Sequence, residues 1–500
     1  MQKEVKRLKK VFLSKTRYCR AVQCEKMLWL DVNKPECAED LGNEEILRNG
    51  TKVGILAKGL LGNYIDIEYN SNKRIMVEDT KKYLMQPPNV ITEASFEYDG
   101  NFCSVDILKN DFDGVEVYEV KSSTEVKDIY LDDISYQAHL IQSLGHKVKI
   151  ACIVHINSEY ERHGELELNK LFKIVDVTDI VNSKQEEITN KIVEIRKYME
   201  QTGEPTDDIG MKCFNPYQCA YWSYCTRNLP DNNVFKVRGM KLKNKFKLYN
   251  NGLIDFKDLE NEKLNDRYLE QIEYEIKEKE DKINQEKINE FLSKLYYPLY
   301  FLDFETYHQA VPEYDVIRPY MQIPFQYSLH YIQNENGKLM HKEFLAEAGE
   351  DPRRKLAERL VEDIPANACV LAYNMRFEKG IIKNLANIFP DLREKLMKIH
   401  DNIFDLMEPF SKRDYYVGAM HGSYSIKYVL PALFPDDKDL DYKALPVVHN
   451  GGEAMQVFAE LGEKPKEEQE VIRKGLLEYC KLDTLAMVKI WEKLNELSKK

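Results

Sequence analysis

The sequence lacks a membrane-length apolar run, because no stretch of about 18 consecutive apolar residues occurs anywhere in its 500 residues. The basic stretch MQKEVKRLKKVFL at its start also lacks the apolar centre of a secretory signal. These absences argue against an integral membrane protein and against a secreted one. We therefore expect a cytoplasmic protein without a membrane partner.

Two nucleotide-binding motifs are missing as well. The absence of a GxGxxG fingerprint disfavours a dinucleotide-dependent oxidoreductase, and without a P-loop any helicase motor would be a separate partner. The net charge of −12 excludes nucleic-acid binding through bulk positive charge alone. One local exception is KVRGMKLKNKFK, residues 236–247, which carries six Lys or Arg around Phe246. It is either a phosphate-binding strip or the solvated face of a linker.

The composition is that of a folded globular protein, with 43% hydrophobic and 31% charged residues. A chain of this length exceeds one ordinary core, so two or three domains are expected. Hydrophobic patterning predicts an α/β domain over residues 1–225 and a charged, mostly helical connector over 226–295. A second α/β domain is predicted over residues 296–500.

The first domain contains a group of polar residues on predicted strands. The stretch at 89–111 predicts a hairpin that turns at Asp99-Gly100 and carries Asp106, and the next strand ends in Glu119 and Lys121. Two carboxylates can hold a divalent metal that activates water, and a lysine can position that water and offset developing charge. By spacing alone, an ordinary surface strand is the alternative.

The order of these residues resembles the PD-(D/E)XK nuclease superfamily, in which an Asp on a hairpin precedes a (D/E)xK strand and a helix with a glutamine. Asp106, Glu119, Lys121 and Gln137 match these roles in order, and Glu93 matches a preceding acid. The resemblance implies a restriction-endonuclease-like fold, metal ligands at Glu93, Asp106 and Glu119, and catalytic roles for Lys121 and Gln137. Relatives often place a histidine on an early helix, and NGTKVGILAKGLLG has none.

Three of the ten cysteines are close together, in CFNPYQCAYWSYC. Cys213, Cys219 and Cys225 are six residues apart and lack the CxxC pair of a usual zinc finger, so zinc is the less favoured ligand. In a reducing cytoplasm a metal or cluster site is favoured over disulfides. A fourth ligand would come from Cys24 or from Cys19, and buried unligated thiols are the alternative.

One cysteine near the start and three after the nuclease core resemble the iron-sulfur branch of the RecB-like nucleases. The resemblance implies a 4Fe-4S cluster on Cys24, Cys213, Cys219 and Cys225 that ties the two ends of the domain together as a structural staple. The match to the usual helix motif is loose, since Glu25 stands where proline is usual.

The second domain contains its own acidic residues. Asp303 and Glu305 are two apart on a predicted strand, so both face the same side and repel unless they share a cation. Glu378 follows a later strand, and Tyr479 and Asp483 are four apart on a helix. Four acids from these elements could hold two metal ions, with Tyr479 aligning the attacking water.

These residues resemble the DnaQ-like DEDD exonucleases of the RNase H fold, in the tyrosine version of the third motif. Asp303 and Glu305 match the first motif, Glu378 stands at the usual second aspartate, and Tyr479 with Asp483 match the third. Asp405 is the reserve candidate for the second position. The whole chain is also similar to a bacterial family of unassigned function that fuses both modules, with signatures such as LDFETY and GSYSIKYVLPALFP.

The sequence therefore predicts a metal-dependent nuclease that hydrolyses DNA or, alternatively, RNA, using Mg²⁺ or Mn²⁺. The second domain is expected to act as a 3′ to 5′ exonuclease beside a RecB-like nuclease domain with its iron-sulfur cluster. Repair or defence systems would supply partners such as a separate helicase. The alternative is a non-catalytic nucleic-acid-binding or iron-sulfur sensing protein.

Overall fold

The computed structural model describes residues 11–42, 44–277 and 279–499, and it is a mixed α/β protein with several sheets. The chain forms two compact units. The first unit contains residues 1–229 and 309–320, and the second contains residues 230–308 and 321–500. Among the described residues, no helix has the length and apolar character needed to cross a membrane.

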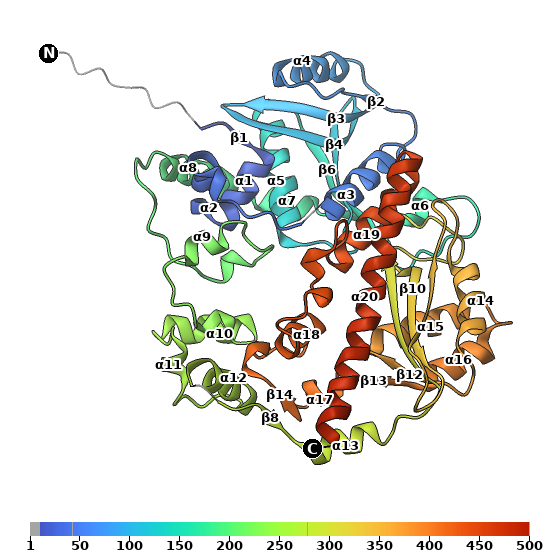
Figure 1. The fold of residues 1–500 in the computed structure, drawn as a ribbon. Coiled ribbons are helices and arrows are strands. Elements are labelled where there is room, and N and C mark those ends of the chain that lie inside the picture. Colours follow the sequence, from blue (N-terminus) through green and yellow to red (C-terminus); the bar gives the residue numbers. More distant parts are fainter. Residues whose placement is uncertain (1–10, 43, 278, 500) are drawn as a thin grey trace. The chain divides into compact units, whose positions relative to one another are not determined.

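The first unit is built around a seven-stranded sheet in the order β2-β3-β4-β5-β6-β7, with β1 paired to β4 (Figure 1). Its strands are β1 (Leu13–Ser14), β2 (Ile65–Asp66), β3 (Asn89–Tyr98), β4 (Asn101–Asp111), β5 (Gly114–Lys121), β6 (Val148–Ile156) and β7 (Phe172–Asp176). Its helices are α1 (Lys15–Gln23), α2 (Glu25–Asn33), α3 (Glu44–Ala57), α4 (Lys73–Leu84), α5 (Asp128–Ser143), α6 (Leu168–Leu171), α7 (Thr178–Ser183), α8 (Gln185–Met199) and α9 (Trp222–Thr226).

The predicted hairpin in this sheet is confirmed. Tyr98 pairs with Asn101, and Asp99 and Gly100 have φ of 51° and 77°, as a tight hairpin turn requires. Strands β4 and β5 are antiparallel, whereas β5 and β6 are parallel and are joined through α5. Helix α5 buries Ile134, Leu140 and Ile141 against the sheet.

The second unit holds a five-stranded sheet in the order β11-β10-β9-β12-β13. Its strands are β8 (Lys282–Ile283), β9 (Leu299–Tyr307), β10 (Ile323–Ile332), β11 (Met340–Leu345), β12 (Cys369–Ala372), β13 (Ile403–Asp405) and β14 (Tyr415–Tyr416). Its helices are α10 (Leu242–Asn250), α11 (Phe256–Leu259), α12 (Asp266–Ile276), α13 (Gln285–Leu292), α14 (Arg353–Asp363), α15 (Arg376–Ile388), α16 (Arg393–Asp401), α17 (Glu408–Ser411), α18 (Ile426–Leu433), α19 (Gly451–Glu460) and α20 (Lys466–Ser498).

Strand β9 lies at the centre of this second sheet. It is antiparallel to β10 and parallel to β12, which is in turn parallel to β13. The long helix α20 packs against β9 and β10 (Figure 1). Apolar side chains such as Phe301 and Leu302 of β9 belong to two separate core clusters of this unit, so both faces of the strand are covered.

The basic stretch at 236–247 folds within the second unit. Its Phe246 is buried, with its ring centroid 4.9 Å from that of Phe235. The ring of Phe246 therefore packs inward, against Phe235 and Tyr249. The cations at Lys236, Arg238, Lys241, Lys243 and Lys247 are exposed.

Residues 309–320 follow β9 directly but pack with the first unit. Arg162 donates through Nη1 to the carbonyl oxygens of Pro312 and Glu313, at 3.0 and 2.9 Å. The hydroxyl of Tyr320 donates to the carbonyl oxygen of Ser122. Residues 309–320 are thus held by contacts within the first unit.

Gly475 of α20 allows a close approach that any side chain would block. A Cβ built there would lie 2.5 Å from Cβ of Val447, which is closer than real Cβ contacts. We expect Gly475→Ala to lower the free energy of unfolding by about 1–3 kcal/mol through overpacking, as measured by urea denaturation. The control is Gly380→Ala in α15, where nothing lies within 4 Å. That exchange should stabilise by about 0.5–1 kcal/mol, and equal effects at both sites would contradict the packing argument.

Candidate functional sites

The first site is formed by side chains from β4, β5, α5 and α1. Glu119 of β5 accepts three hydrogen bonds: Oε1 accepts from Lys121 at 2.6 Å and from Lys15 at 2.8 Å, and Oε2 accepts from Gln137 at 2.7 Å. Asp106 of β4 accepts through Oδ2 from the backbone N–H of Val120 at 2.7 Å. The structure therefore brings together four residues that the sequence predicts for this site.

Two further residues of this site were not predicted. Asp133 of α5 accepts from Lys121 at 2.7 Å and from Gln137 at 3.0 Å, and Lys15 of α1 lies 3.7 Å from it. Asp133 precedes Gln137 by four residues on one helix, so the shared face was available as a signal. Lys15 is 104 residues from Glu119, and nothing in its local sequence marks it.

The first site opens onto a cavity of about 690 Å³ in the first unit. Lys15, Glu93, Asp106, Lys121 and Asp133 are among the residues that line it. Glu93 of β3 has a left-handed backbone, with φ of 56°, and its carboxylate lies 3.8 Å from Lys58. A non-glycine residue in this region carries roughly 1–2 kcal/mol of strain. Glu93 is therefore at the cavity but outside the hydrogen-bonded group around Glu119.

The pKa values of the two central carboxyls of the first site, Asp106 and Glu119, are shifted in opposite directions. Burial raises the pKa of Asp106 to about 7, and the nearby charge of Glu119 adds to the shift. Burial also opposes ionisation of Glu119, yet the charges of Lys121 and Lys15 outweigh it and lower the pKa of Glu119. One carboxyl is therefore ionised near neutral pH while its neighbour is half protonated.

This difference predicts a proton release. If Asp106 is a metal ligand, Mn²⁺ binding must displace its proton, so about 0.5 proton should be released per ion at pH 7 and only about 0.1 at pH 8. Isothermal titration calorimetry in buffers of different ionisation enthalpy measures this number, using Asp303→Asn protein so that the second site is silenced. Proton release that is the same at both pH values would contradict the assignment of Asp106.

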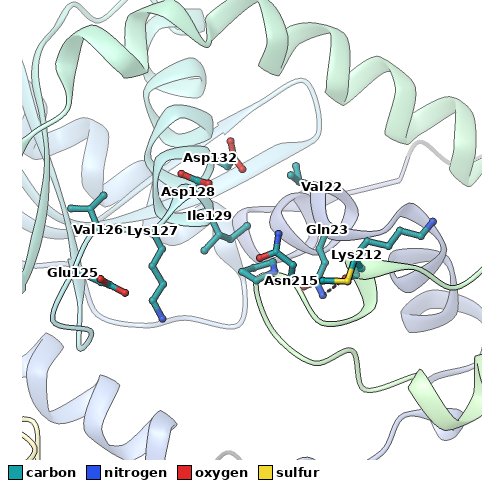
Figure 2. Close-up of a pocket in the computed structure, with 12 residues that line it drawn as sticks. Val22, Gln23, Glu125, Val126, Lys127, Asp128, Ile129, Asp132, Lys212 and Asn215 are labelled. Atoms are coloured by element: carbon teal, nitrogen blue, oxygen red, sulfur yellow. Dashed lines mark hydrogen bonds between the residues drawn. The ribbon is translucent and has the colours of Figure 1, made fainter. Parts of the chain in front are cut away.

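A second cavity of about 700 Å³ lies beside the first site, and none of the predicted site residues lines it. Figure 2 shows it between the end of α1, represented by Gln23, the start of α5 at Lys127 and Asp128, and the segment around Lys212 and Asn215. It is lined by both cations and carboxylates, including Glu125 and Asp132, so its charge favours no single class of ligand.

Four cysteines line one narrow pocket: Cys24, Cys213, Cys219 and Cys225. Cys19 instead lines the cavity of the first site, so the structure groups Cys24 with the other three. Burial raises the pKa of the Cys219 thiol to about 11 and also raises the pKa of Cys213 and Cys225. The thiols of Cys213, Cys219 and Cys225 are thus held neutral when no metal binds them.

The distances between the four sulfur atoms can be compared with those around a single bound zinc ion. Four thiolates around one zinc ion would lie about 3.8 Å apart, given a Zn–S distance of about 2.3 Å. No three of these sulfurs come within 4.8 Å of one another, since across the described residues only Asp303, Glu305 and Cys480 form such a group. The four cysteines of this pocket supply the donor chemistry of a metal centre.

The second site gathers acids from β9, α15 and α20. Oxygen atoms of Asp303 and Glu305 and the sulfur of Cys480 all lie within 4.8 Å of one another. Cys480, which was not predicted, lies 3.7 Å from Oδ2 of Asp303. The expectation that Asp303 and Glu305 project together from the strand is confirmed.

Burial raises the pKa of every acid in this site, and repulsion by neighbouring acids adds to the shift for Asp303 and Glu305. For Asp303 the shift is large, with burial as the main cause and Asp483 and Glu305 next, and Glu305 is raised in the same way. The pKa of Glu378 rises to about 8 and that of Asp483 to about 6, both mainly through burial. Clustered buried carboxyls of this kind are relieved by a bound cation.

Glu378 lies in the first turn of α15, and only 2% of it is exposed. Its Oε2 is buried and accepts no hydrogen bond within the described part of the chain. The reserve candidate Asp405 is occupied differently, because its Oδ1 accepts the backbone N–H groups of Asn374 and Met407, each at 3.0 Å. Asp405 therefore holds the turn before α15, and Glu378 is the residue left with a vacant oxygen.

Two tyrosines, Tyr479 of α20 and Tyr442 from an earlier segment, lie beside Asp483 of α20. The hydroxyl of Tyr442 donates to Oδ1 of Asp483 at 2.6 Å, and its ring centroid lies 5.9 Å from that of Tyr479. Burial and the charge of Asp483 raise the pKa of Tyr479, so both tyrosines stay protonated. Tyr442 begins a 3-10 helix of three residues, Tyr442–Ala444, which is too short for a periodic pattern, so no sequence signal pointed to it.

With both sites described, the chain can be compared with known proteins. Residues 300–425 match the domain of unknown function DUF2779. The DUF2779 match contains Asp303, Glu305 and Glu378, and it ends before Tyr479 and Asp483. A search of curated protein sequences found no match to the chain. The DUF2779 match supports a family relationship for this part of the chain and does not indicate an activity.

Proposed function

We propose that this protein is a metal-dependent nuclease with two hydrolytic sites, one in each unit. The observation that carries the proposal is the second site, where Asp303, Glu305, Glu378 and Asp483 are gathered on a strand and two helices, and where the cation that acts on them among the described residues is the exposed Lys427. Two divalent ions would neutralise these acids, and a phosphodiester bound to them would be attacked by an aligned water.

The topology of the second unit supports an RNase H-like assignment. A central strand β9 that continues into an antiparallel meander through β10 and β11 on one side and has the parallel strands β12 and β13 on the other is the arrangement expected for DnaQ-like exonucleases. In this proposal Tyr479 orients the water, and Tyr442 holds Asp483 in place. The second site then acts as a 3′ to 5′ exonuclease.

The first unit supports a PD-(D/E)XK assignment in the same way. Asp106 and Glu119 lie on adjacent antiparallel strands, and Lys121 and Gln137 both donate to Glu119. In this proposal Asp106, Glu119 and Glu93 hold Mg²⁺ or Mn²⁺, and Lys121 offsets charge at the scissile phosphate. The four-cysteine pocket holds a 4Fe-4S cluster that fastens α1 to the segment at 213–225.

The test uses the intact, cluster-loaded protein with 5′-labelled and 3′-labelled single-stranded DNA and RNA in Mn²⁺. A descending ladder from the 5′ label indicates 3′ to 5′ exonuclease action, and internal products indicate cleavage by the first site. Neither labelled strand should be cleaved in EDTA, because EDTA removes the divalent metal. Absence of any cleavage on all substrates, including duplexes, would rule out the nuclease proposal.

The four-cysteine pocket favours one alternative, a non-catalytic nucleic-acid-binding protein that senses redox state through its cluster. Such a protein would bind nucleic acid stoichiometrically without turnover, and cluster oxidation would change its affinity. The two outcomes are separated by the same labelled substrates in a gel-shift assay with and without oxidant.

A further inference from the structure

Helix α1 connects the four-cysteine pocket to the first site. Lys15 is its first residue, and Cys24 follows its last residue as the C-terminal cap. Nine residues of α-helix span about 13 Å. One short rigid element therefore carries a site lysine at its beginning and a pocket cysteine at its end.

Lys15 belongs to the charged group of the first site. Its Nζ lies 2.8 Å from Oε1 of Glu119 and 3.7 Å from Asp133, and 23% of its side chain is exposed. Lys121 binds the same oxygen of Glu119 at 2.6 Å. The carboxylate that would bind metal is thus shared by two ammonium groups, of which only Lys121 belongs to the strand motif.

The far end of α1 is fastened to the cysteine segment. The Nε2 of Gln23 donates to the carbonyl oxygens of Lys212 and Tyr217, at 2.8 and 2.7 Å, next to Cys213 and between Cys213 and Cys219. A second connection runs through Tyr217, whose hydroxyl lies 3.2 Å from that of Tyr130. Lys121 lies 5.2 Å from the Tyr130 ring centroid. The cysteine segment thus reaches both lysines.

From these contacts we infer that Lys15 is a positioning residue of the first site, and that the four-cysteine pocket sets its place through α1. This inference rests on the proposed hydrolytic function of the first site. Lys15 acts through Glu119: it orients the carboxylate for the metal and restrains how tightly the metal is held. A metal centre on the four thiols keeps the end of α1 fixed, and loss of that centre releases Lys15.

The alternative is that core packing alone places α1. Tyr18 of α1 stacks on Tyr136 of α5 with ring centroids 4.4 Å apart, and Tyr136 donates to the carbonyl oxygen of Leu13. If this packing sufficed, changes at Cys24 would not affect the site. A double-mutant cycle between Lys15 and Cys24 distinguishes the two accounts, because residues that act through one element are non-additive.

The experiment uses the full chain with Asp303→Asn, so that turnover comes from the first site and Mn²⁺ binding at the second site is weakened equally in every variant compared. Lys15→Met, Lys15→Arg, Cys24→Ser and Lys15→Met/Cys24→Ser are compared for kcat, KM and Mn²⁺ affinity by calorimetry. Lys170→Met and Cys37→Ser are the matched controls, since Lys170 is an exposed lysine paired with Glu167 and Cys37 lies outside the four-cysteine pocket.

We expect Lys15→Met to lower kcat about 10- to 100-fold, as removal of a residue behind a metal ligand does. Because an ammonium that competes for Glu119 is gone, Mn²⁺ should bind more tightly, with KM for nucleic acid little changed. Lys15→Arg keeps the charge and should recover most of kcat. Cys24→Ser should lower kcat by a similar factor, and adding it to Lys15→Met should cause no further loss.

Several outcomes would overturn the inference. Unchanged kcat in Lys15→Met makes Lys15 a bystander, and a parallel loss of kcat and Mn²⁺ affinity indicates structural damage instead of positioning. Multiplicative effects of Lys15→Met and Cys24→Ser would show that the pocket does not act through Lys15. If this background has no Lys121-dependent turnover at all, the proposed hydrolytic function of the first site fails, and the Mn²⁺ affinities of the same variants still decide the link between Cys24 and Lys15.

Discussion

Asp303→Asn is expected to abolish the descending ladder from a 5′-labelled strand, with a loss of at least about 1,000-fold in rate, or roughly 4 kcal/mol of transition-state stabilisation. Asp303 is the acid that all others in the second site repel, and asparagine keeps its shape while removing the charge that binds metal. The measurement is a single-turnover time course in Mn²⁺ with wild-type and variant protein.

Although Asp303→Asn should abolish activity, it should not destabilise the protein when no metal is bound. A neutral amide relieves repulsion with Glu305 and Asp483, so Tm in EDTA should stay level or rise. Mn²⁺ should raise Tm in the wild type through binding to the folded state, and it should do so less in the variant. The control is Asp391→Asn, an exposed acid paired with Arg354, which should leave the ladder intact. A variant at Asp303 that still produces the ladder would remove this residue from the reaction.

Lys121→Met is the second change with a large expected effect. In the Asp303→Asn background it should reduce cleavage by the first unit at least about 100-fold, because the ammonium that neutralises charge near the reacting phosphate is lost. Lys121 contacts Glu119 and Asp133 at 2.6 and 2.7 Å, so methionine also leaves these acids with Lys15 and Gln137 as their remaining side-chain donors among the contacts described above. Quantified internal products from an unlabelled duplex and a single strand report the rate.

The matched control for Lys121 is Lys109 of β4, which pairs with Glu116 at 3.0 Å on the same sheet. Lys109→Met removes an equal charge and should leave cleavage within about twofold of the background, because Lys109 is outside the first site and its buried partner Glu116 keeps the hydroxyl of Tyr118 as a donor. If both lysine variants lost the same fraction of activity, general electrostatic attraction of nucleic acid would explain the result, and Lys121 would have no special role.

The sequence by itself determined those features that depend on neighbours along the chain. Alternation and the Asp99-Gly100 turn predicted the hairpin of β3 and β4, since a turn of this type needs two residues with positive φ. The two-residue spacing of Asp303 and Glu305 placed both carboxylates on one side of β9, because side chains of a strand alternate. In both cases the geometry is set within a few residues.

Only the tertiary structure decided which distant residues complete each site. Lys15 reaches Glu119 across 104 residues, Tyr442 reaches Asp483 across 41, and Cys24 rather than Cys19 joins the other three cysteines. Such contacts depend on how helices dock onto sheets, and a single short helix such as α1 presents Cys19 and Cys24 to different pockets. No local pattern contains that information, because docking is set by the packing of the whole unit.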